Sequence, residues 1–341
     1  WLLYQMLLEM GVKPGLIGTV EHRFGHVRRE TPFTTPPSAD LHRTFGEMVT
    51  ASCTHVALEA SSHGLAQQRL AGVQIQIAGF TNLSRDHLDY HDSMASYRQA
   101  KWKLFEQFAQ LACFNIDDET GRAFSSQFKG RQITVSLSEN PADILARDIE
   151  NDLSGTRATI ESREGTYPLH LPLVGAYNLE NAMVALGMAV LSGYAVEDAV
   201  SALRSVTPAP GRMELVPGDR QVFVDYAHTP DALENVLSVL KPLTRGRLFC
   251  LFGAGGDRDQ GKRPEMGRAV SAFADVALVT SDNPRTEDPD SIIRQICDGM
   301  TDQVETIVEP DRKAAIERAV NALQIDDVLL IAGKGHEPYQ L

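Results

Sequence analysis

Short apolar runs alternate with polar or helical stretches along the first third of the chain. Apolar residues at helical spacing predict a helix over residues 1–11, closed by Gly11, and a second helix over residues 94–111. Apolar runs bounded by turn residues predict three strands, in the segments GLIGTV, THVALEA and IQIAGFTNL. Strands that alternate with helices in this way are typical of parallel βαβ units.

The pattern changes in the next part of the chain. Strands joined by turn residues are predicted in the segments ITVSLSE, ILARDIEND, TRATIES and YPLHLPL, which indicates a small, mostly antiparallel layer. Two helices are expected after them, in NLENAMVALGMAVLSG and VEDAVSALRSV.

The segment TPAPG, Thr207 to Gly211, interrupts both periodicities with two prolines and a glycine, and we interpret it as a linker. A second alternation follows, with strands in QVFVDYA, RLFCLFGA, DVALVT and DVLLIAG, and it is typical of a doubly wound unit. We therefore predict an α/β protein of two domains. Residues 1–207 would form a mostly parallel sheet with the small antiparallel layer, and residues 208–341 a Rossmann-like domain.

Composition narrows the class of protein. A chain of 341 residues with 43% hydrophobic and 23% charged residues can bury two domain cores, and no apolar run approaches the roughly 20 residues of a membrane span. The formal charge of -13 argues against nucleic-acid binding without a local basic patch. The four cysteines show no paired spacing, which disfavours a zinc site or a disulfide framework and favours a reducing cytoplasm.

Six predicted strands end in polar clusters: EASSHGL, TNLSRDHLDYH, DYAHTPD, GAGGDRDQGKRP, SDNPR and GKGHE. Ligands of open α/β sheets bind beyond the carboxyl ends of the strands, so six such clusters predict a cleft between two α/β domains. For any one cluster, and for the DNP turn of SDNPR above all, a solvated turn is the alternative.

Three residues and one loop could carry metal or phosphate chemistry. Glu59 and His87 follow neighbouring predicted strands, and they could hold Mg²⁺ beside phosphate oxygens, although a hydrogen-bonded structural histidine is the alternative for His87. Lys101 lies on a predicted amphipathic helix, where a solvated surface lysine is the simplest interpretation. The loop GAGGDRD has glycines for a close backbone approach, but the chain contains no G-x-x-x-x-G-K-[ST] phosphate loop.

Ten motifs occur in an order and spacing that resembles the Mur ligase family. They are TTP, EASSHGL, FTNLSRDHLDYH, YRQAKW, GAYNLENA, PGRME, DYAHTPDAL, FGAGGDRDQGKRP, SDNPRTEDP and AGKGHE. Among the Mur ligases, the chain is most similar to those that add meso-2,6-diaminopimelate. The resemblance covers essentially every residue.

The resemblance implies an ATP-dependent amide ligase of peptidoglycan precursor synthesis. ATP would phosphorylate the D-Glu carboxylate of UDP-N-acetylmuramoyl-L-alanyl-D-glutamate, and an amine of meso-diaminopimelate would displace phosphate from the acyl phosphate. Glu59, His87 and Lys101 match the residues that bind Mg²⁺, with Lys101 as a carbamate, which replaces the interpretation as a surface lysine. Residues 1–207 would be the ATP-binding domain and residues 208–341 the amino-acid-binding domain.

The resemblance also assigns residues to the substrates. The muramoyl dipeptide would be held by Thr34, Thr35, Ser61, Gln67 and Arg69, and the nucleotide by Asn178, Arg212, Asp225 and His228. Diaminopimelate would be held by Arg258, Asp282, Asn283, Pro284, Arg285, Gly333 and Glu337. An arginine suits this substrate, because diaminopimelate has a distal carboxylate that lysine lacks.

The family comparison also predicts that the chain is a fragment. Family members carry a domain for the uridine nucleotide and a GTxGKT phosphate loop before the position of Trp1, and further helices after Leu341, so the chain alone is expected to be inactive. Two alternatives stay open: a module that only binds the amino acid, and another ligase of the superfamily such as a folylpolyglutamate synthetase. A cytoplasmic monomer that binds neither nucleic acid nor membrane is expected.

Overall fold

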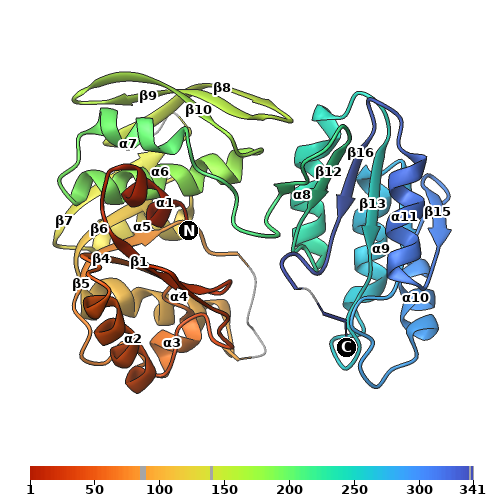
Figure 1. Ribbon diagram of the computed structural model, residues 1–341, viewed down its shortest axis with the longest axis horizontal. Helices are drawn as coiled ribbons and strands as arrows, with labels where there is room; N and C mark the ends of the chain where they lie inside the picture. Colours follow the sequence, from red (N-terminus) through yellow and green to blue (C-terminus); the bar gives the residue numbers. More distant parts are fainter. Residues whose placement is uncertain (85–89, 139–140, 338, 341) are drawn as a thin grey trace. The chain divides into compact units, whose positions relative to one another are not determined.

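The computed structural model describes residues 1–84, 90–138, 141–337 and 339–340. The chain divides into two compact units, Trp1–Thr207 and Pro208–Leu341, which we call unit 1 and unit 2 and describe separately (Figure 1). Both are mixed α/β structures: unit 1 combines parallel and antiparallel strand pairs, and unit 2 is mainly parallel, so the predicted α/β fold class is confirmed. No helix among the described residues combines the length and the apolar character needed to cross a membrane.

Unit 1 contains two hydrogen-bonded sheets. The four-stranded sheet has the order β3-β2-β1-β4, and its strands are β1 (Pro14–Ile17), β2 (His22–Phe24), β3 (Val27–Arg29) and β4 (His55–Leu58). The six-stranded sheet has the order β10-β9-β8-β7-β6-β5. Its strands are β5 (Ile75–Phe80), β6 (Ala109–Asn115), β7 (Arg131–Ser136), β8 (Ile144–Asp152), β9 (Gly155–Ser162) and β10 (Gly165–Leu171).

The helices of unit 1 are α1 (Leu2–Glu9), α2 (Ser38–Thr50), α3 (Ser62–Ala66), α4 (Met94–Lys103), α5 (Glu119–Gln127), α6 (Ala176–Leu191) and α7 (Val196–Leu203), with a π-helical turn, η1 (Leu104–Phe108). Helix α6 packs on β5, β6 and β7, and α1 and α7 pack on α6 (Figure 1). Side chains of β6 alternate between two cores: Cys113 lies in the core under α6, whereas Phe114 lies in an aromatic core with Phe80, Phe105 and Phe124.

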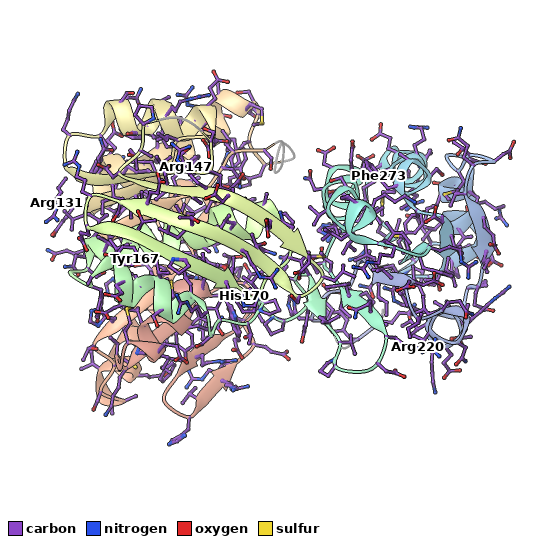
Figure 2. All side chains as sticks on the ribbon, turned by 90° about the horizontal axis from the view of Figure 1, so that it is seen from above. Arg131, Arg147, Tyr167, His170, Arg220 and Phe273 are labelled. Atoms are coloured by element: carbon purple, nitrogen blue, oxygen red, sulfur yellow. The ribbon has the colours of Figure 1, made fainter. Side chains whose placement is uncertain are left out.

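Two sequence predictions for unit 1 are corrected, and one pair of strands was missed. The helix expected over residues 94–111 is shorter: α4 ends at Lys103, η1 continues to Phe108, and strand β6 begins at Ala109, because pairing with β5 and β7 overrides the local helical spacing. The hairpin β2–β3 was not predicted at all. The segment ITVSLSE was expected in the antiparallel layer, but its strand β7 pairs in parallel with β6 and β8. The antiparallel strands β8, β9 and β10 extend the same sheet. Figure 2 labels Arg147 on β8 and Tyr167 and His170 on β10.

Unit 2 contains one six-stranded sheet with the order β11-β12-β16-β13-β14-β15. Its strands are β11 (Glu214–Leu215), β12 (Gln221–Val224), β13 (Leu248–Phe252), β14 (Val276–Val279), β15 (Glu305–Val308) and β16 (Val328–Ile331). Its helices are α8 (Pro230–Leu243), α9 (Lys262–Phe273), α10 (Pro289–Cys297) and α11 (Arg312–Ala322). All neighbouring strands run in parallel except β11 and β12.

The central strands of unit 2 place the candidate site residues together. Strand β13 lies between β16 and β14, and all five of its residues are buried, as expected for a parallel strand covered on both faces. Helix α11 contributes to the core on the face of Phe249 and Leu251. Because the strands are parallel, the loops after β12, β13, β14 and β16 leave from one edge of the sheet. Strand β15 and helix α11 were not predicted from the sequence.

Candidate functional site

The Glu59 carboxylate follows strand β4, beside the end of the parallel strand β1. Both the backbone N–H and the hydroxyl of Thr19 donate to its Oε2 atom, at 2.8 and 2.7 Å. The hydroxyl of Thr19 also lies 2.9 Å from that of Thr34. A Cβ atom on Gly18 would lie 3.1 Å from the carboxyl carbon of Glu59, so the backbone passes close to this group. The carboxylate is exposed, yet two donors from one residue fix its orientation.

Thr35 is fully buried and connects the Glu59 backbone to helix α3. Its hydroxyl donates to the carbonyl oxygen of Glu59 at 2.7 Å and accepts a hydrogen bond from the Ser61 N–H at 2.9 Å. The Ser61 hydroxyl then accepts from the Gly64 N–H at 3.1 Å and caps the helix. The hydroxyl of Thr35 is therefore satisfied as donor and acceptor, and its position is determined by the fold.

Arg69 connects the remaining predicted dipeptide residues. Its Nη1 donates to the carbonyl oxygen of Thr35 at 2.7 Å, and its Nε and Nη2 both donate to Oε1 of Gln67, at 3.0 and 2.6 Å. The side-chain amide of Gln67 donates to the hydroxyl of Tyr90 at 3.2 Å. The guanidinium carbon of Arg69 lies 4.8 Å from the centre of the Phe33 ring. The five residues predicted to hold the dipeptide thus form one connected network.

Lys101 lies in the last turn of α4 and is half-buried, which differs from a fully solvated surface lysine. Its Nζ lies 5.1 Å from the centre of the Tyr97 ring, and Tyr97 stacks on His91 with ring centres 5.0 Å apart. The buried His91 lies 2.9 Å from the Ser62 hydroxyl, and α3 packs against α4. A chain of contacts therefore joins Lys101 to the segment that carries Ser61.

The predicted metal site is only partly visible. His87 lies outside the described residues, and among the described residues no group of three His, Cys, Asp or Glu side chains is arranged to hold a metal ion. The strands that precede Glu59 and His87 in the sequence, β4 and β5, do not pair with each other among the described residues. Strand β4 pairs with β1 and β5 pairs with β6, so the two strands belong to different sheets.

Three of the four predicted nucleotide residues lie together in unit 2. Asp225 follows β12 and accepts from the N–H groups of Met213 and Ala227, at 2.7 and 2.8 Å. Burial raises the pKa of this carboxyl group, and the two backbone donors oppose that shift. The guanidinium of Arg212 lies 4.7 Å from the Tyr226 ring centre, and His228 Nδ1 lies 2.9 Å from the Tyr226 carbonyl oxygen.

Asn178, the fourth predicted nucleotide residue, lies in unit 1. Its side-chain amide donates to the carbonyl oxygen of Val174 at 2.8 Å, immediately before helix α6. The amide thereby stabilises the turn into this helix.

The turn after β14 carries Asp282 and Asn283, both buried. Lys334, which follows β16, donates to the Asn283 side-chain oxygen at 2.9 Å, and the Asn283 amide donates to Oε2 of Glu337 at 3.3 Å. The Tyr226 hydroxyl donates to the other oxygen of Glu337 at 3.3 Å. Loops after β12, β14 and β16 therefore meet in one polar network, and Lys334 fixes which way the Asn283 amide points.

Asp282 is the most confined carboxylate of this network. Its Oδ1 lies 3.9 Å from Lys334 Nζ, and its Oδ2 lies 3.9 Å from Arg312 Nη1. Oδ2 is buried without a hydrogen-bond partner among the described residues. Gly333 has φ +109, and a Cβ atom there would lie 2.7 Å from this oxygen. Glycine is needed at position 333 both for its backbone conformation and for this close approach.

Arg285 has the left-handed φ of 52, and its Nη1 donates to the Gly256 carbonyl oxygen at 2.6 Å. The Gly256 N–H in turn donates to the carbonyl oxygen of Asn283 at 2.9 Å, and a Cβ atom on Gly256 would lie 1.9 Å from the Pro284 carbonyl oxygen. The glycines of GAGGDRD thus allow a close backbone approach, as predicted, but to the turn after β14 of the protein itself. Arg258 is exposed on the same loop.

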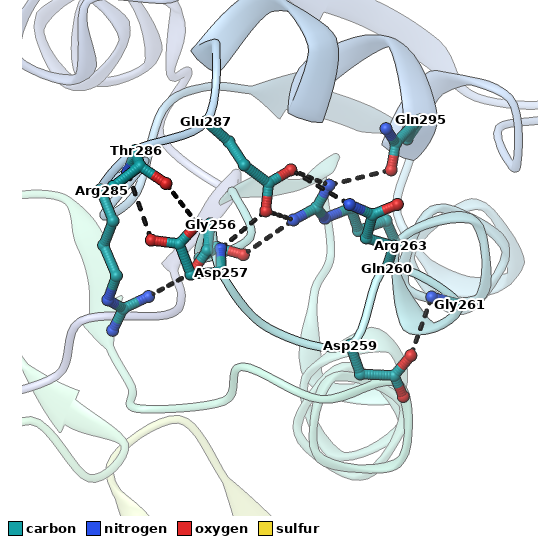
Figure 3. Close-up of polar contacts among 11 residues, drawn as sticks. Gly256, Asp257, Asp259, Gln260, Gly261, Arg263, Arg285, Thr286, Glu287 and Gln295 are labelled. Carbon is teal, nitrogen blue, oxygen red and sulfur yellow. Dashed lines mark hydrogen bonds and ion pairs between the residues drawn. The ribbon is translucent and has the colours of Figure 1, made fainter.

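Sequence reasoning missed several residues of these networks. Thr19, Tyr226 and Lys334 follow strand ends, and this position was the signal that could have identified them. Arg263 carried no such signal, because nothing in the sequence indicates that its charged side chain is completely buried. Figure 3 shows its contacts with Glu287 and Gln295.

Comparison with protein families identifies the class of this fold. A profile described as Mur ligase middle domain matches residues 1–189, and a second, described as Mur ligase, glutamate ligase domain, matches residues 211–335. This chain belongs to the Mur ligase family.

Named Mur ligases align with nearly the whole chain. A UDP-N-acetylmuramoyl-L-alanyl-D-glutamate--2,6-diaminopimelate ligase from Chromobacterium violaceum is 43% identical over 345 residues, which cover 99% of this chain and 70% of that protein. The enzyme of the same name from Gloeobacter violaceus is 41% identical, with 99% of this chain and 70% of that protein covered. A solved structure of a ligase of this name matches with a TM-score of 0.75 and 37% identity, covering 99% of this chain and 71% of the other.

Proposed function

We propose that this Mur ligase chain takes part in the ATP-dependent ligation of meso-2,6-diaminopimelate to UDP-N-acetylmuramoyl-L-alanyl-D-glutamate, a step of peptidoglycan precursor synthesis. The observation that carries the proposal is the turn after β14, residues 282–285, which we call the recognition turn: its buried Asp282 and Asn283 share one network with Lys334 and Glu337 of the loop after β16, and Arg285 lies beside it at the surface. The names of relatives that cover 99% of the chain support it.

The amino-acid substrate is assigned to unit 2. A guanidinium has five N–H donors, so Arg285 can pair with a carboxylate while its Nη1 holds the Gly256 carbonyl oxygen. We assign the distal carboxylate of diaminopimelate to Arg285 and Arg258. We assign the ammonium group next to that carboxylate to Glu337, so that the amine at the other end is the one that reacts. Lysine would leave the guanidinium of Arg285 without a carboxylate partner, which gives selectivity for the substrate with two carboxylates.

The muramoyl dipeptide is assigned to unit 1. The network of Thr35, Ser61 and Arg69 presents hydroxyl, amide and guanidinium groups that match peptide groups and a carboxylate. The nucleotide is assigned to Arg212, Asp225 and His228, around the Tyr226 ring of unit 2.

Two described residues are suited to a magnesium site. Glu59 offers an oxygen ligand of the kind that Mg²⁺ prefers, and Thr19 holds this carboxylate in one orientation. Lys101 would act as a ligand only as a carbamate, which replaces a cationic amine by an anionic oxygen donor. When bound, the ion would neutralise charge on the phosphoryl group during its transfer from ATP.

The chemistry of the step then follows from the assigned groups. The D-Glu carboxylate takes the terminal phosphoryl group of ATP and becomes an acyl phosphate. One amine of diaminopimelate, in its neutral form, attacks the acyl carbon. The amide bond forms, phosphate leaves with the electron pair of the broken C–O bond, and the proton lost by the amine passes to the leaving phosphate or to water. Residues of unit 1 orient the acyl group and residues of unit 2 orient the amine, so positioning is the main contribution of the protein.

Calorimetry on the 341-residue chain tests the assignment of the amino acid. We expect meso-diaminopimelate to bind, and lysine to have a dissociation constant at least tenfold higher. A tenfold difference corresponds to about 1.4 kcal/mol of binding free energy, a modest effect for one unmatched charged group. Ligation is tested in parallel by incubating a protein that carries this sequence with ATP, the UDP-linked dipeptide and labelled diaminopimelate, and by following tripeptide and ADP. Equal binding of both amino acids would contradict the proposal.

A further inference from the structure

Arg263 is a fully buried arginine near the start of α9, with 0% of its surface exposed. Its Nη1 and Nη2 atoms donate to the two carboxylate oxygens of Glu287, both at 2.8 Å (Figure 3). Nη1 also donates to the Gln295 side-chain oxygen at 2.9 Å, and Nη2 to the carbonyl oxygen of Gly255 at 3.2 Å. One guanidinium therefore connects the glycine-rich loop, the segment after the recognition turn and helix α10.

Glu287 binds the same loop a second time. Its Oε1 accepts from the backbone N–H of Asp257 at 2.6 Å. The Asp257 carboxylate in turn accepts from the hydroxyl of Thr286 at 2.7 Å. The hydrogen bonds of Arg263 and Asp257 lower the pKa of Glu287 to about 2, so the pair with Arg263 is fully charged at neutral pH.

Arg285 lies within this set of contacts and has a conformation that needs support. Its φ of 52 is in the left-handed region, which residues other than glycine adopt only when the surroundings determine it. On one side, the Asn283 carbonyl oxygen is held by Gly256. On the C-terminal side of Arg285, the Thr286 hydroxyl donates to the Asp257 carboxylate and the Glu287 carboxylate accepts from Arg263.

We propose that Arg263 and Glu287 are positioning residues: their ion pair, in which Arg263 is completely buried and Glu287 is partly exposed, fixes the left-handed conformation of Arg285 and so sets the selectivity for an amino acid with a distal carboxylate. This inference rests on the proposed function of the recognition turn. Stability alone does not require a charged pair here, since apolar residues of similar size often replace buried ion pairs without loss of stability.

The experiment compares the dissociation constants of meso-diaminopimelate and lysine on the 341-residue chain. The variants are Arg263→Lys, Glu287→Gln, Arg285→Ala and the double variant Arg263→Lys/Arg285→Ala. The control is Arg220→Lys, which makes the same substitution at an arginine away from the turn. Arg220 donates to the backbone carbonyl oxygens of Val320 and Leu323. Calorimetry gives the ratio of the two dissociation constants for each variant.

We expect Arg263→Lys to lower the preference for diaminopimelate by about tenfold, within the range found for directly coupled neighbours. Glu287→Gln should have a similar effect, and the control should stay within about twofold. The double variant should lose no more preference than Arg285→Ala alone, because the pair acts through Arg285. Equal weakening of both amino acids, or full additivity in the double variant, would show that the pair only stabilises the unit.

Hydrogen exchange on the unliganded chain provides a second readout that needs no substrate. Exchange at the backbone N–H of Thr286 and Glu287 should accelerate in the variants at positions 263 and 287, and should not change in Arg220→Lys. The paired variant Arg263→Met/Glu287→Met removes both charges, so that the comparison does not depend on an uncompensated buried charge. If the wild-type chain fails to bind diaminopimelate, the proposed function is wrong. If exchange at Thr286 and Glu287 is unchanged in the variants, the positioning role of Arg263 and Glu287 is wrong, whatever the substrate.

Discussion

The candidate sites of the two units are built from different chemistry. In unit 1 hydroxyl groups link the site: the Thr19 hydroxyl donates to the Glu59 carboxylate, and the Thr35 hydroxyl donates to the Glu59 carbonyl oxygen and accepts from the Ser61 N–H. In unit 2 the central residues are charged and buried, with Asp282 8% exposed and Arg263 0% exposed.

This difference has a physical consequence. A hydroxyl group donates and accepts by rotating, so the network of unit 1 can adjust when a substrate replaces one of its partners. A buried charge must keep its partner, because separation leaves it desolvated and uncompensated. We therefore expect unit 2 to select its substrate by a fixed arrangement of charges, and unit 1 to bind by adaptable polar contacts. Four predictions test this contrast, in order of decreasing effect.

The largest effect is expected for Lys101→Ala, because it would remove the carbamate and with it a charge at the proposed metal site. We expect turnover to fall by about 10²- to 10³-fold, the scale for loss of one group that stabilises charge in the transition state. Steady-state kinetics of a ligation-competent protein with this sequence would measure it, and short carboxylic acids should restore part of the activity.

Lys103→Ala is the matched control for this prediction, since Lys103 lies in the same last turn of α4. Near-normal turnover of Lys101→Ala, or an equal loss in both variants, would return Lys101 to the role of a surface lysine.

The second effect concerns Arg285→Ala, which removes the exposed guanidinium from the turn of unit 2. Loss of one partner of a charge-assisted pair costs on the order of 2 to 5 kcal/mol, or roughly 30-fold or more in specificity for diaminopimelate. Lysine should be used almost as before, and ATP and the dipeptide should bind normally. Specificity constants for both amino acids measure this, and an equal fall for both would mean that Arg285 shapes the turn without contacting substrate.

A smaller effect is expected for Thr19→Val, which keeps the backbone donor to Glu59 but removes the hydroxyl donor. Magnesium affinity should fall by about tenfold, the lower end of the range for losing a partner of a metal ligand. The control is Thr50→Val, because the Thr50 hydroxyl donates only within helix α2, to the carbonyl oxygen of Gly46. Magnesium titration of turnover measures the effect, and an unchanged affinity would exclude Glu59 as a ligand oriented by Thr19.

The smallest effect is the pH dependence of stability due to Glu287. Its folded-state pKa, lowered to about 2 by Arg263 and the Asp257 N–H, lies below the ordinary value of 4.5. The ionised pair therefore stabilises the folded state above about pH 4.5, and this contribution disappears as the pH falls toward 2. The difference in free energy of unfolding between wild type and Glu287→Gln should be constant above pH 5 and should narrow below it. A constant difference down to pH 2.5, measured by urea unfolding, would contradict the assignment.

Much of the fold was predictable because local patterns and tertiary contacts agree. The helix α10 begins at the sequence signal Asp288-Pro289, with the Asp288 side chain as its cap, and its apolar residues occupy one buried face. The buried run of β14 was equally clear. The predictions failed where a helical segment is followed directly by a strand, as at η1 and β6. They also failed where a strand is short or exposed, as in β2, β3 and β15.

For the candidate site, the sequence determined which residues stand at strand ends and which family motifs they match. That was sufficient to name Thr35, Glu59, Asp282 and Arg285, because each follows a strand or belongs to an ordered motif. It could not determine partners that lie far apart in the chain. Arg263 and Glu287 are separated by a strand and a helix, and only the parallel pairing of β13 with β14 brings the two loops together.

The sequence by itself thus determined the α/β class, the strand-end positions of the candidate residues and the chemistry that those residues offer. Only the tertiary structure decided that β8, β9 and β10 extend the parallel sheet, that Gly256 approaches the recognition turn, and that the Arg263 guanidinium is buried. The physical reason is that helix periodicity and turn preference are local properties of the chain. Sheet order and the partner of a buried charge are instead fixed by contacts between residues distant in sequence.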